Sequence, residues 1–338
     1  MVVTVLMDGL GSSSGCAVSS DGSFVLVSQF TKNNIKKYWI KGAKAGSSED
    51  FTNWISGPTS IRRIGSTGNF WVNSAKDIDG GLVSFRSIAQ SAFKFNSNGE
   101  LLQKIYISSR PGYISDVNEF NGWLYIGTPH LRFVLPTSLI SAVRGADLLN
   151  PTRIPEFSAN VQDYTYLTFL ILVQKSVKSP EKDTSAVISV DAYFQKLLLP
   201  RDVSGPRSIA FDPTGKRFYT GVSGGKILKY TPETGFVDFA YMTTLSDSSL
   251  CHGIVGPLLW GFCGRPAGIA LNEKTGDLYV ADATLGLHVV SPAGGLAVKI
   301  ADSVDGKPIR NLDGLDVDPT TGVVYFTSLT SNLYPIVL

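Results

Sequence analysis

The stretch S-I-A-F-D-P-T-G-K-R-F-Y-T-G, from Ser208 to Gly221, decides the fold. An apolar segment leads into the turn D-P-T-G, and an aromatic-rich segment follows it. This pattern predicts a β-hairpin, because Asp, Pro and Gly favour tight turns while aromatic residues favour strands. What the hairpin means for the whole chain depends on whether it recurs.

The hairpin pattern occurs six times, with turn glycines at Gly22, Gly68, Gly122, Gly215, Gly276 and Gly322. The intervals between them are 46, 54, 93, 61 and 46 residues. A period near fifty residues, with two to four strands in each unit, is typical of β-propeller blades. We therefore predict an all-β fold, a six-bladed β-propeller. The alternative is a β-sandwich, but sandwiches do not keep one hairpin motif at blade-length spacing.

Both ends of the chain are expected to close this ring. The segment Val2–Met7 alternates like a strand, and we predict an edge strand there that closes the ring against the C-terminal strands and leaves no open sheet edge. The whole chain, 1–338, is predicted to be one propeller domain. Residues 129–192 are interpreted as linker or insertion, although residues 166–173 form an apolar octet that suits a buried strand or a signal-peptide core.

The bulk composition limits the possible partners. The chain is 43% hydrophobic and 17% charged, with a net charge of +2, so it lacks the basic character expected of a nucleic-acid-binding protein. No apolar run reaches the eighteen residues that suggest a membrane span, and the first residues lack the basic and cleavage features of a signal peptide. We expect a monomer whose partner is a small molecule.

Four motifs carry a resemblance to a known family: residues 21–30, 36–42, 204–230 and 263–271. They resemble the plant strictosidine synthase-like family of six-bladed propellers over roughly residues 1–128 and 193–328. The resemblance implies a small-molecule site in the central channel and a location in the secretory pathway or vacuole.

The order of these motifs differs from the order in the family. Residues 1–128 resemble the family's C-terminal half, and residues 193–338 resemble its N-terminal half. The chain is therefore expected to be circularly permuted, or else to span a junction between tandem copies. A ring of blades tolerates moved termini, because each blade contacts mainly its neighbours.

The same resemblance implies a pairing for two of the three cysteines. Cys251 and Cys263 match the family's disulfide pair in spacing and in the Gly-Arg that follows. The alternative is two free thiols, and an oxidising compartment favours the bridge. Cys16 is expected to be unpaired and buried.

Polar residues at the starts of the inner strands are candidates for a channel site, because inner strands converge on the centre of a propeller. The candidates for catalysis are Ser115, Asp116 and Asp313, and those for substrate binding are Tyr113, Arg207, Asn311 and Thr59. Asn311 and Asp313 could also hold calcium, which prefers oxygen ligands, as in related lactonase-type propellers. The alternative is that these polar residues only hydrate a pore.

The resemblance also suggests what the chain does not catalyse. Strictosidine synthases use a channel glutamate as general base and acid just before the matching hairpin. Alignment on that hairpin places Ser115 at the glutamate and Tyr113 at a neighbouring histidine. Because a serine hydroxyl without a base cannot relay protons near neutral pH, strictosidine formation is not expected. Ser115 also lacks a G-x-S-x-G elbow and a nearby histidine, which argues against a serine hydrolase.

The predicted function is hydrolysis of an ester or lactone, with Asp313, Asn311 and Asp116 holding a metal ion or a water. Two alternatives stay open: a non-catalytic or degenerate small-molecule-binding propeller, and retained alkaloid-forming synthase activity.

Overall fold

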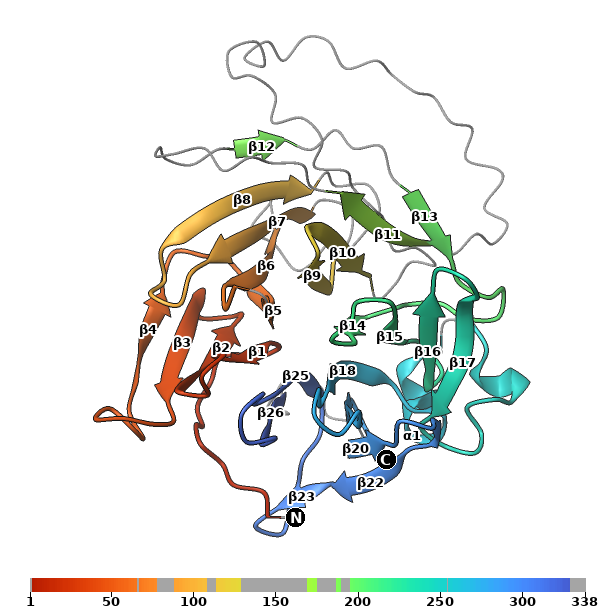
Figure 1. Cartoon of the computed structure of the whole chain (residues 1–338). Helices are drawn as coiled ribbons and strands as arrows, with labels where there is room; N and C mark the ends of the chain where they lie inside the picture. The colour runs from red at the N-terminus through yellow and green to blue at the C-terminus, as the bar shows by residue number, and fades with distance from the viewer. Residues whose placement is uncertain are drawn as a thin grey trace.

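The structure is a computed structural model that describes residues 2–65, 67–77, 88–107, 114–128, 169–174, 187–189, 195–253 and 255–328. Its strands form separate sheets set around a common centre (Figure 1). The first sheet contains β1 (Cys16–Val18), β2 (Phe24–Gln29), β3 (Asn34–Trp39) and β4 (Ser48–Thr52). The second contains β5 (Pro58–Arg63), β6 (Phe70–Asp77), β7 (Ile88–Phe95) and β8 (Leu101–Ile107), with β12 (Val187–Ser189) parallel to β8.

The next sheets repeat this antiparallel arrangement. The third contains β9 (Asp116–Phe120), β10 (Trp123–Gly127), β11 (Phe169–Gln174) and β13 (Gln195–Leu198). The fourth contains β14 (Ser208–Phe211), β15 (Phe218–Gly221), β16 (Lys226–Thr231) and β17 (Gly235–Tyr241), with β21 (Gly295–Leu296) parallel to β17. The fifth contains β18 (Pro266–Leu271), β19 (Leu278–Asp282), β20 (Gly286–Val290) and β22 (Val298–Ala301).

Two short pairs complete the described strands: β23 (Ser303–Val304) with β24 (Lys307–Pro308), and β25 (Leu312–Val317) with β26 (Val324–Ser328). The innermost strands contact one another in the cyclic order β1, β5, β9, β14, β18 and β25, and β25 returns to β1. The all-β prediction and the propeller arrangement are therefore confirmed. The described helices are short: η1 (Ser249–Cys251), η2 (Pro257–Leu259) and α1 (Trp260–Cys263).

The repeated hairpins are the inner strand pairs of these sheets. Each of the six turn glycines has a positive φ, from 65° at Gly215 to 77° at Gly122 and Gly276. Glycine adopts this conformation without the steric cost that a Cβ atom brings. The sequence repeat thus corresponds to one recurring turn geometry at the inner hairpins.

Apolar residues fill the spaces between neighbouring sheets. One cluster joins Trp71 of β6, Leu124 of β10 and Phe218 of β15, which belong to three successive sheets. Phe120 stacks on Phe211 of the next sheet at a ring-centroid distance of 4.9 Å. Full burial of one such side chain contributes about 1.5–3 kcal/mol, so these contacts hold the inner strands, and the residues they carry, in fixed positions.

The predicted N-terminal edge strand is wrong. Residues 2–7 form no strand, and Val2 is 90% exposed. Side-chain hydrogen bonds tie the following residues to the first sheet instead, from Lys32 Nζ to Gly9 O and from Gly11 N to Gln29 Oε1. The ring closes because β1 packs on β25 and β26, where Val18 N donates to Asp316 Oδ2 over 2.9 Å.

Part of the stretch predicted as linker belongs to the sheets. Residues 169–174, which overlap the apolar octet at 166–173, form β11 between β10 and β13. Residues 187–189 form β12 beside β8. The rest of 129–192 lies outside the described residues. In the described part of the chain, no helix has the length and apolar character needed to cross a bilayer.

Candidate functional site in the central channel

A pocket lies where the inner strands begin. Its empty space is about 270 Å³, part of which is open to solvent. All six inner strands or the residues just before them supply its wall: Ser14, Gly15, Cys16, Ser60, Ile61, Arg62, Ser115, Asp116, Arg207, Ser208, Ala267, Gly268, Asp313, Gly314 and Leu315. Residues from distant parts of the sequence therefore meet at one site.

The pocket is narrow because neighbouring inner strands approach closely through glycines. A Cβ atom at Gly268 would collide with Asp313 O, and one at Gly15 would collide with Thr59 O. Any other residue at these positions would push the inner strands apart. The glycines thus set the spacing of the pocket walls, and the polar side chains beside them project into a small space.

Arg62 links several inner strands across this space. Its guanidinium lies 2.8 Å from Asp116 on β9, donates to Ser208 Oγ on β14, and donates to Ile269 O on β18 over 3.3 Å. Asp116 is 1% exposed, and both of its oxygens accept hydrogen bonds from Arg62. Ile209 N donates a further bond to Asp116 Oδ2 over 3.0 Å. Asp116 is therefore fully engaged in holding the channel together.

A second ion pair joins Arg207, just before β14, to Asp313 on β25. Arg207 Nη2 lies 2.6 Å from Asp313 Oδ2. Asp313 Oδ1 accepts no hydrogen bond from the described residues, and both residues line the pocket. The Arg207 side chain is 23% exposed, so this pair faces the open space. The pair therefore places a carboxylate oxygen and a guanidinium side by side at the pocket wall.

Burial shifts the pKa values of two charged residues on this side of the channel, Asp313 and Arg265. It raises the pKa of Asp313 above its ordinary value, and the positive charges of Arg207, Arg265 and Arg62 only partly offset the effect. Burial also lowers the pKa of Arg265 to about 9, with a further contribution from the nearby charge of Arg207. Asp313 is thus a better proton acceptor at neutral pH than an exposed aspartate.

The predicted site residues divide into three groups. Ser115, Asp116, Arg207 and Asp313 line the pocket together. Thr59 does not, because its hydroxyl donates to Asn73 O and accepts from Asn73 Nδ2. Asn311 lies outside the lining as well, and its backbone N–H donates to Ala283 O. Tyr113 lies outside the described residues.

The predicted calcium site does not fit the residues present. Asp313 already pairs with Arg207, and Asn311 does not reach the pocket lining. Three guanidinium groups, those of Arg62, Arg207 and Arg265, surround Asp313 closely enough to affect its pKa. Within the described residues, no three His, Cys, Asp or Glu side chains gather to hold a metal ion. We therefore derive no chemistry through calcium.

Sequence reasoning missed Arg62, Ser14 and Ser208. Arg62 follows the strand start that was identified from Thr59, so its position on β5 gave a usable signal. Ser14 and Ser208 are small residues beside glycine or arginine, and nothing in their local pattern distinguishes them. Only the closure of the ring brings them to the pocket.

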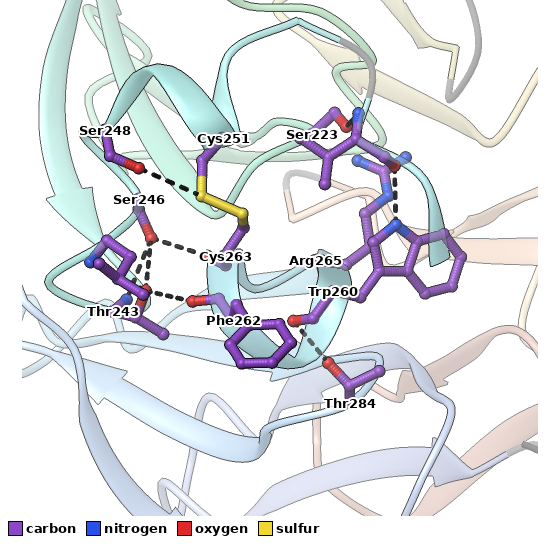
Figure 2. The surroundings of a disulfide bond; sticks show 12 residues. Ser223, Thr243, Ser246, Ser248, Cys251, Trp260, Phe262, Cys263, Arg265 and Thr284 are labelled. Carbon is purple, nitrogen blue, oxygen red and sulfur yellow. Dashed lines mark hydrogen bonds between the residues drawn. A yellow bond between two sulfur atoms is a disulfide. The ribbon is translucent and has the colours of Figure 1, made fainter. Parts of the chain in front are cut away.

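The predicted disulfide between Cys251 and Cys263 is present, and Cys16 is free and buried, as predicted. The bridge closes the segment that leads to β18 (Figure 2). Side chains from the neighbouring sheets bind its carbonyl groups, with Thr243 Oγ1 donating to Phe262 O over 2.7 Å and Thr284 Oγ1 to Trp260 O over 2.9 Å. The segment is therefore anchored beside the start of an inner strand.

Known proteins share parts of this sequence. The strictosidine synthase family model matches residues 1–43. Strictosidine synthase-like protein 12 of Arabidopsis thaliana is 72% identical over 153 residues, which cover 45% of this chain and 46% of the relative. Strictosidine synthase of Catharanthus roseus is 36% identical over 138 residues, which cover 40% of this chain and 39% of that enzyme. These parts of the chain are similar to the strictosidine synthase-like family. The chain spans about half the length of the curated relatives it matches.

Solved structures match nearly the whole chain. Regucalcin from Agrobacterium tumefaciens, a calcium-binding protein, aligns with a TM-score of 0.54 at 12% identity, covering 98% of this chain and 86% of that one. A gluconolactonase from Xanthomonas campestris aligns with a TM-score of 0.52 at 14% identity, covering 96% and 85%. At such low identity these matches show the propeller fold alone.

Ser115 occupies the position that the family resemblance gives to the synthase glutamate. Its hydroxyl donates to Arg207 O over 2.7 Å, and its backbone N–H donates to Gly127 O. Ser115 and Asp116 both line the pocket although they are neighbours in sequence. The reason is that β9 begins only at Asp116, so Ser115 precedes the regular alternation. A hydroxyl bound in this way holds the backbone before β14 rather than relaying protons.

Proposed function

We propose that the chain binds a small organic molecule in its central channel and hydrolyses an ester or lactone there without a metal ion. The observation that carries this proposal is the pair formed by Asp313 and Arg207 at the pocket wall. Asp313 has an open oxygen and a pKa raised by burial, and the Arg207 guanidinium lies 2.6 Å away. A proton acceptor and a positive group then face the same small space.

In the proposed reaction, Asp313 accepts a proton from a water molecule while the water oxygen attacks the substrate carbonyl carbon. The carbonyl π electrons move to oxygen, and Arg207 stabilises the resulting negative charge. The tetrahedral intermediate then releases the alcohol oxygen, which receives the proton from Asp313. The products are an acid and an alcohol, or a hydroxy acid from a lactone. Because Asp313 must be ionised, the rate is expected to rise with pH through its raised pKa.

The comparisons support a hydrolytic activity only indirectly. One solved neighbour is a gluconolactonase, and that protein shares the fold of this chain at low identity. The sequence relatives include a strictosidine synthase, but Ser115 stands where the resemblance places the synthase glutamate. We expect no product from tryptamine and secologanin, and formation of strictosidine would contradict this view.

The decisive experiment measures turnover of aryl esters and lactones by the purified chain and by Asp313→Asn. Loss of a general base reduces the rate by about 10²–10⁴-fold, while Asp305→Asn, in the exposed turn between β23 and β24, should keep full activity. A chelator such as EDTA should leave the rate unchanged. Absence of turnover in the unmodified chain, equal rates in Asp313→Asn, or loss of activity with EDTA would overturn the proposal.

A second candidate function is ligand binding without catalysis. Arg62 spans the channel, and both channel carboxylates already have arginine partners. This arrangement favours a channel whose charged groups stabilise the fold rather than catalyse a reaction. Binding of a small ester or lactone without turnover, unaffected by Asp313→Asn, would favour this candidate.

We further propose that the ring has six blades and that the chain is one permuted, monomeric domain. Support for the count comes from the cyclic contacts of six innermost strands. Support for the permutation comes from the motif order, with 1–128 and 193–338 resembling the two halves of the family in reverse. The Cys251–Cys263 bridge supports a location in the secretory pathway or vacuole, where oxidising conditions preserve disulfides. Light scattering of the purified chain would test the monomeric state. Localisation of a tagged form would test the compartment.

A further inference from the structure

The segment between β17 and β18, which the disulfide closes, carries several exposed apolar side chains. Four large ones are at least 45% exposed: Leu245, Leu250, Leu258 and Phe262. Leu258 on η2 reaches 92%, the highest value for a large apolar side chain in the described structure. Single exposed apolar residues are normal on a protein surface, but a group of them on one short segment is typical of a surface that another molecule covers.

A rigid backbone supports these side chains. The bridge joins Cys251 of η1 to Cys263 of α1, with their Cα atoms 5.6 Å apart (Figure 2). Ser246 Oγ donates to Cys263 O over 2.7 Å, and Trp260 Nε1 donates to Val255 O over 2.9 Å. The apolar side chains are therefore presented in a fixed arrangement, which lowers the entropic cost of binding a partner.

Acidic side chains gather beside this apolar surface. Asp247, on the same segment, lies 2.8 Å from Lys226 Nζ, and carboxylate oxygens of Asp238 and Asp202 lie 3.0 Å and 3.8 Å from the same nitrogen. The backbone connects the cluster to the segment as well, since Gly253 N donates to Asp202 O over 2.7 Å. The Lys226 side chain is only 6% exposed, whereas the three aspartate side chains are 35–68% exposed. Solvent therefore meets the carboxylates and not the ammonium group.

The cluster carries an excess of negative charge. Three carboxylates surround one ammonium group, which leaves two negative charges. Arg201 is exposed and next to Asp202 in sequence, but no ion pair joins it to the cluster in the described structure, and counting it still leaves one negative charge. His252 Nε2 lies 3.7 Å from Asp202 Oδ2 and adds positive charge only when protonated. Such a surface repels anionic lipids and nucleic acids and attracts cationic groups.

We infer that residues 245–262 and the aspartates beside them form a docking surface for a cationic, amphipathic segment of a partner protein. The partner's apolar side chains cover the exposed leucines and Phe262, and its lysines or arginines face Asp202, Asp238 and Asp247. Apolar contact supplies most of the affinity, while charge complementarity sets the choice of partner and the rate of association. The inference is independent of the chemistry proposed for the channel, because none of these residues lines the pocket.

The test uses a fluorescein-labelled peptide of about fourteen residues, designed as an amphipathic helix with leucines on one face and lysines on the other. Its dissociation constant for the full chain is measured by fluorescence anisotropy. One control peptide has glutamate in place of every lysine, and a second has serine in place of every leucine. The lysine–leucine peptide should bind at least about tenfold more tightly than either control, and salt should weaken its binding because it screens the charges.

Variants of the chain locate the binding surface. Leu258→Ser together with Phe262→Ser should weaken binding of the lysine–leucine peptide by about tenfold or more, because two apolar contacts are lost. Asp247→Asn should weaken it by about two- to five-fold and reduce its salt dependence. Leu102→Ser is the matched control, because Leu102 is 50% exposed on β8 of another sheet, and this variant should bind as the unmodified chain does.

Several results would overturn the inference. They are no binding of the lysine–leucine peptide, equal affinity for the three peptides, binding that salt leaves unchanged, and full binding by the Leu258→Ser, Phe262→Ser variant. Association of the unmodified chain with neutral phosphatidylcholine vesicles that is lost in the same double variant would also overturn it, because the surface would then bind a membrane instead of a protein. Since both substituted side chains are exposed, thermal unfolding of the double variant should match that of the unmodified chain.

Discussion

Two arginine–aspartate pairs meet in the channel, and they differ in how completely each carboxylate is bound. Asp116 accepts bonds at both oxygens from Arg62 and a further bond from Ile209 N. Asp313 is bound at Oδ2 by Arg207 and has an open Oδ1 within the described structure. Both aspartates are buried, but the first pair crosses several inner strands while the second borders open space.

The difference separates structural from chemical use of the same two residue types. A buried carboxylate that is fully hydrogen-bonded holds its neighbours in place. A buried carboxylate with an unbound oxygen can exchange a proton with water. The Arg62–Asp116 pair therefore fixes the channel, and the Arg207–Asp313 pair is the candidate for chemistry.

The largest expected effect comes from breaking the first pair. Arg62→Met leaves Asp116 buried without its cation, and removing one partner of a buried pair costs about 3–5 kcal/mol. Arg207→Met should cost less than half of that, because Asp313 can take up a proton. Thermal and urea unfolding of the two variants measures the difference in the free energy of unfolding.

A double variant controls for the loss of packing at Arg62. Arg62→Met with Asp116→Leu removes both charges, and apolar replacement of a buried ion pair is often neutral or stabilising. It should recover most of the stability lost in Arg62→Met. If the two single arginine variants lose the same stability, the distinction between the two pairs fails.

The pKa of Asp318 is lowered, whereas the pKa of Asp313 is raised. Burial acts to raise the pKa of Asp318, but hydrogen bonds from Thr320 and Thr321 outweigh that effect and lower the pKa to about 2. Its stabilisation is therefore present above the unfolded pKa near 4 and is lost as pH falls towards 2. The shift corresponds to about 2 kcal/mol, so Asp318→Asn should lose about that much stability at pH 7.

Urea unfolding between pH 2.5 and pH 7 checks this prediction. The difference between the unmodified chain and Asp318→Asn should shrink as pH falls. A difference that stays constant with pH would show that the loss comes from geometry and not from the lowered pKa.

A smaller effect is expected at Asp313. A raised pKa means that its contribution to stability is present below the unfolded pKa and is lost as pH rises through the folded value. The stability advantage of the unmodified chain over Asp313→Asn should therefore decrease from pH 4 to pH 8. An advantage that stays constant over this range would contradict the raised pKa of Asp313 as its cause.

The smallest effect on global stability is expected from the disulfide. Replacement of Cys251 and Cys263 by serine should mainly loosen residues 252–262, because the bridge closes a short segment at the edge of the inner strands. Limited proteolysis should cut this segment faster, with a change in melting temperature of only a few degrees. A large cooperative loss of the whole fold would contradict a local role.

The fold was predictable because one hairpin recurs. Six turn glycines at near-blade spacing identified the inner strand pairs, and all six adopt the positive φ that such turns need. The alternation of residues 2–7 was misleading, because a strand also requires a partner edge, which sequence pattern does not reveal. β11 was ambiguous for a similar reason: a short apolar run fits a strand or a signal core equally well.

The site was only partly predictable. Inner-strand starts correctly led to Ser115, Asp116, Arg207 and Asp313 as channel residues. The pairing of Asp313 with Arg207, which does not suit calcium, could not be predicted, because it depends on contacts between segments more than a hundred residues apart. Ser14 could not be found from the sequence, since only the closure of the ring brings it to the pocket.

The seam between β1 and β25–β26 has an entropic consequence. Its contact from Cys16 Sγ to Tyr325 O joins residues 309 apart, whereas neighbouring inner hairpins lie about one blade apart. The entropic cost of closing a loop grows only with the logarithm of its length, so a closure six times longer costs about 1.6 kcal/mol more. The ring thus imposes only a weak preference on where the chain starts, and a different order of the same segments can reach the same closed arrangement.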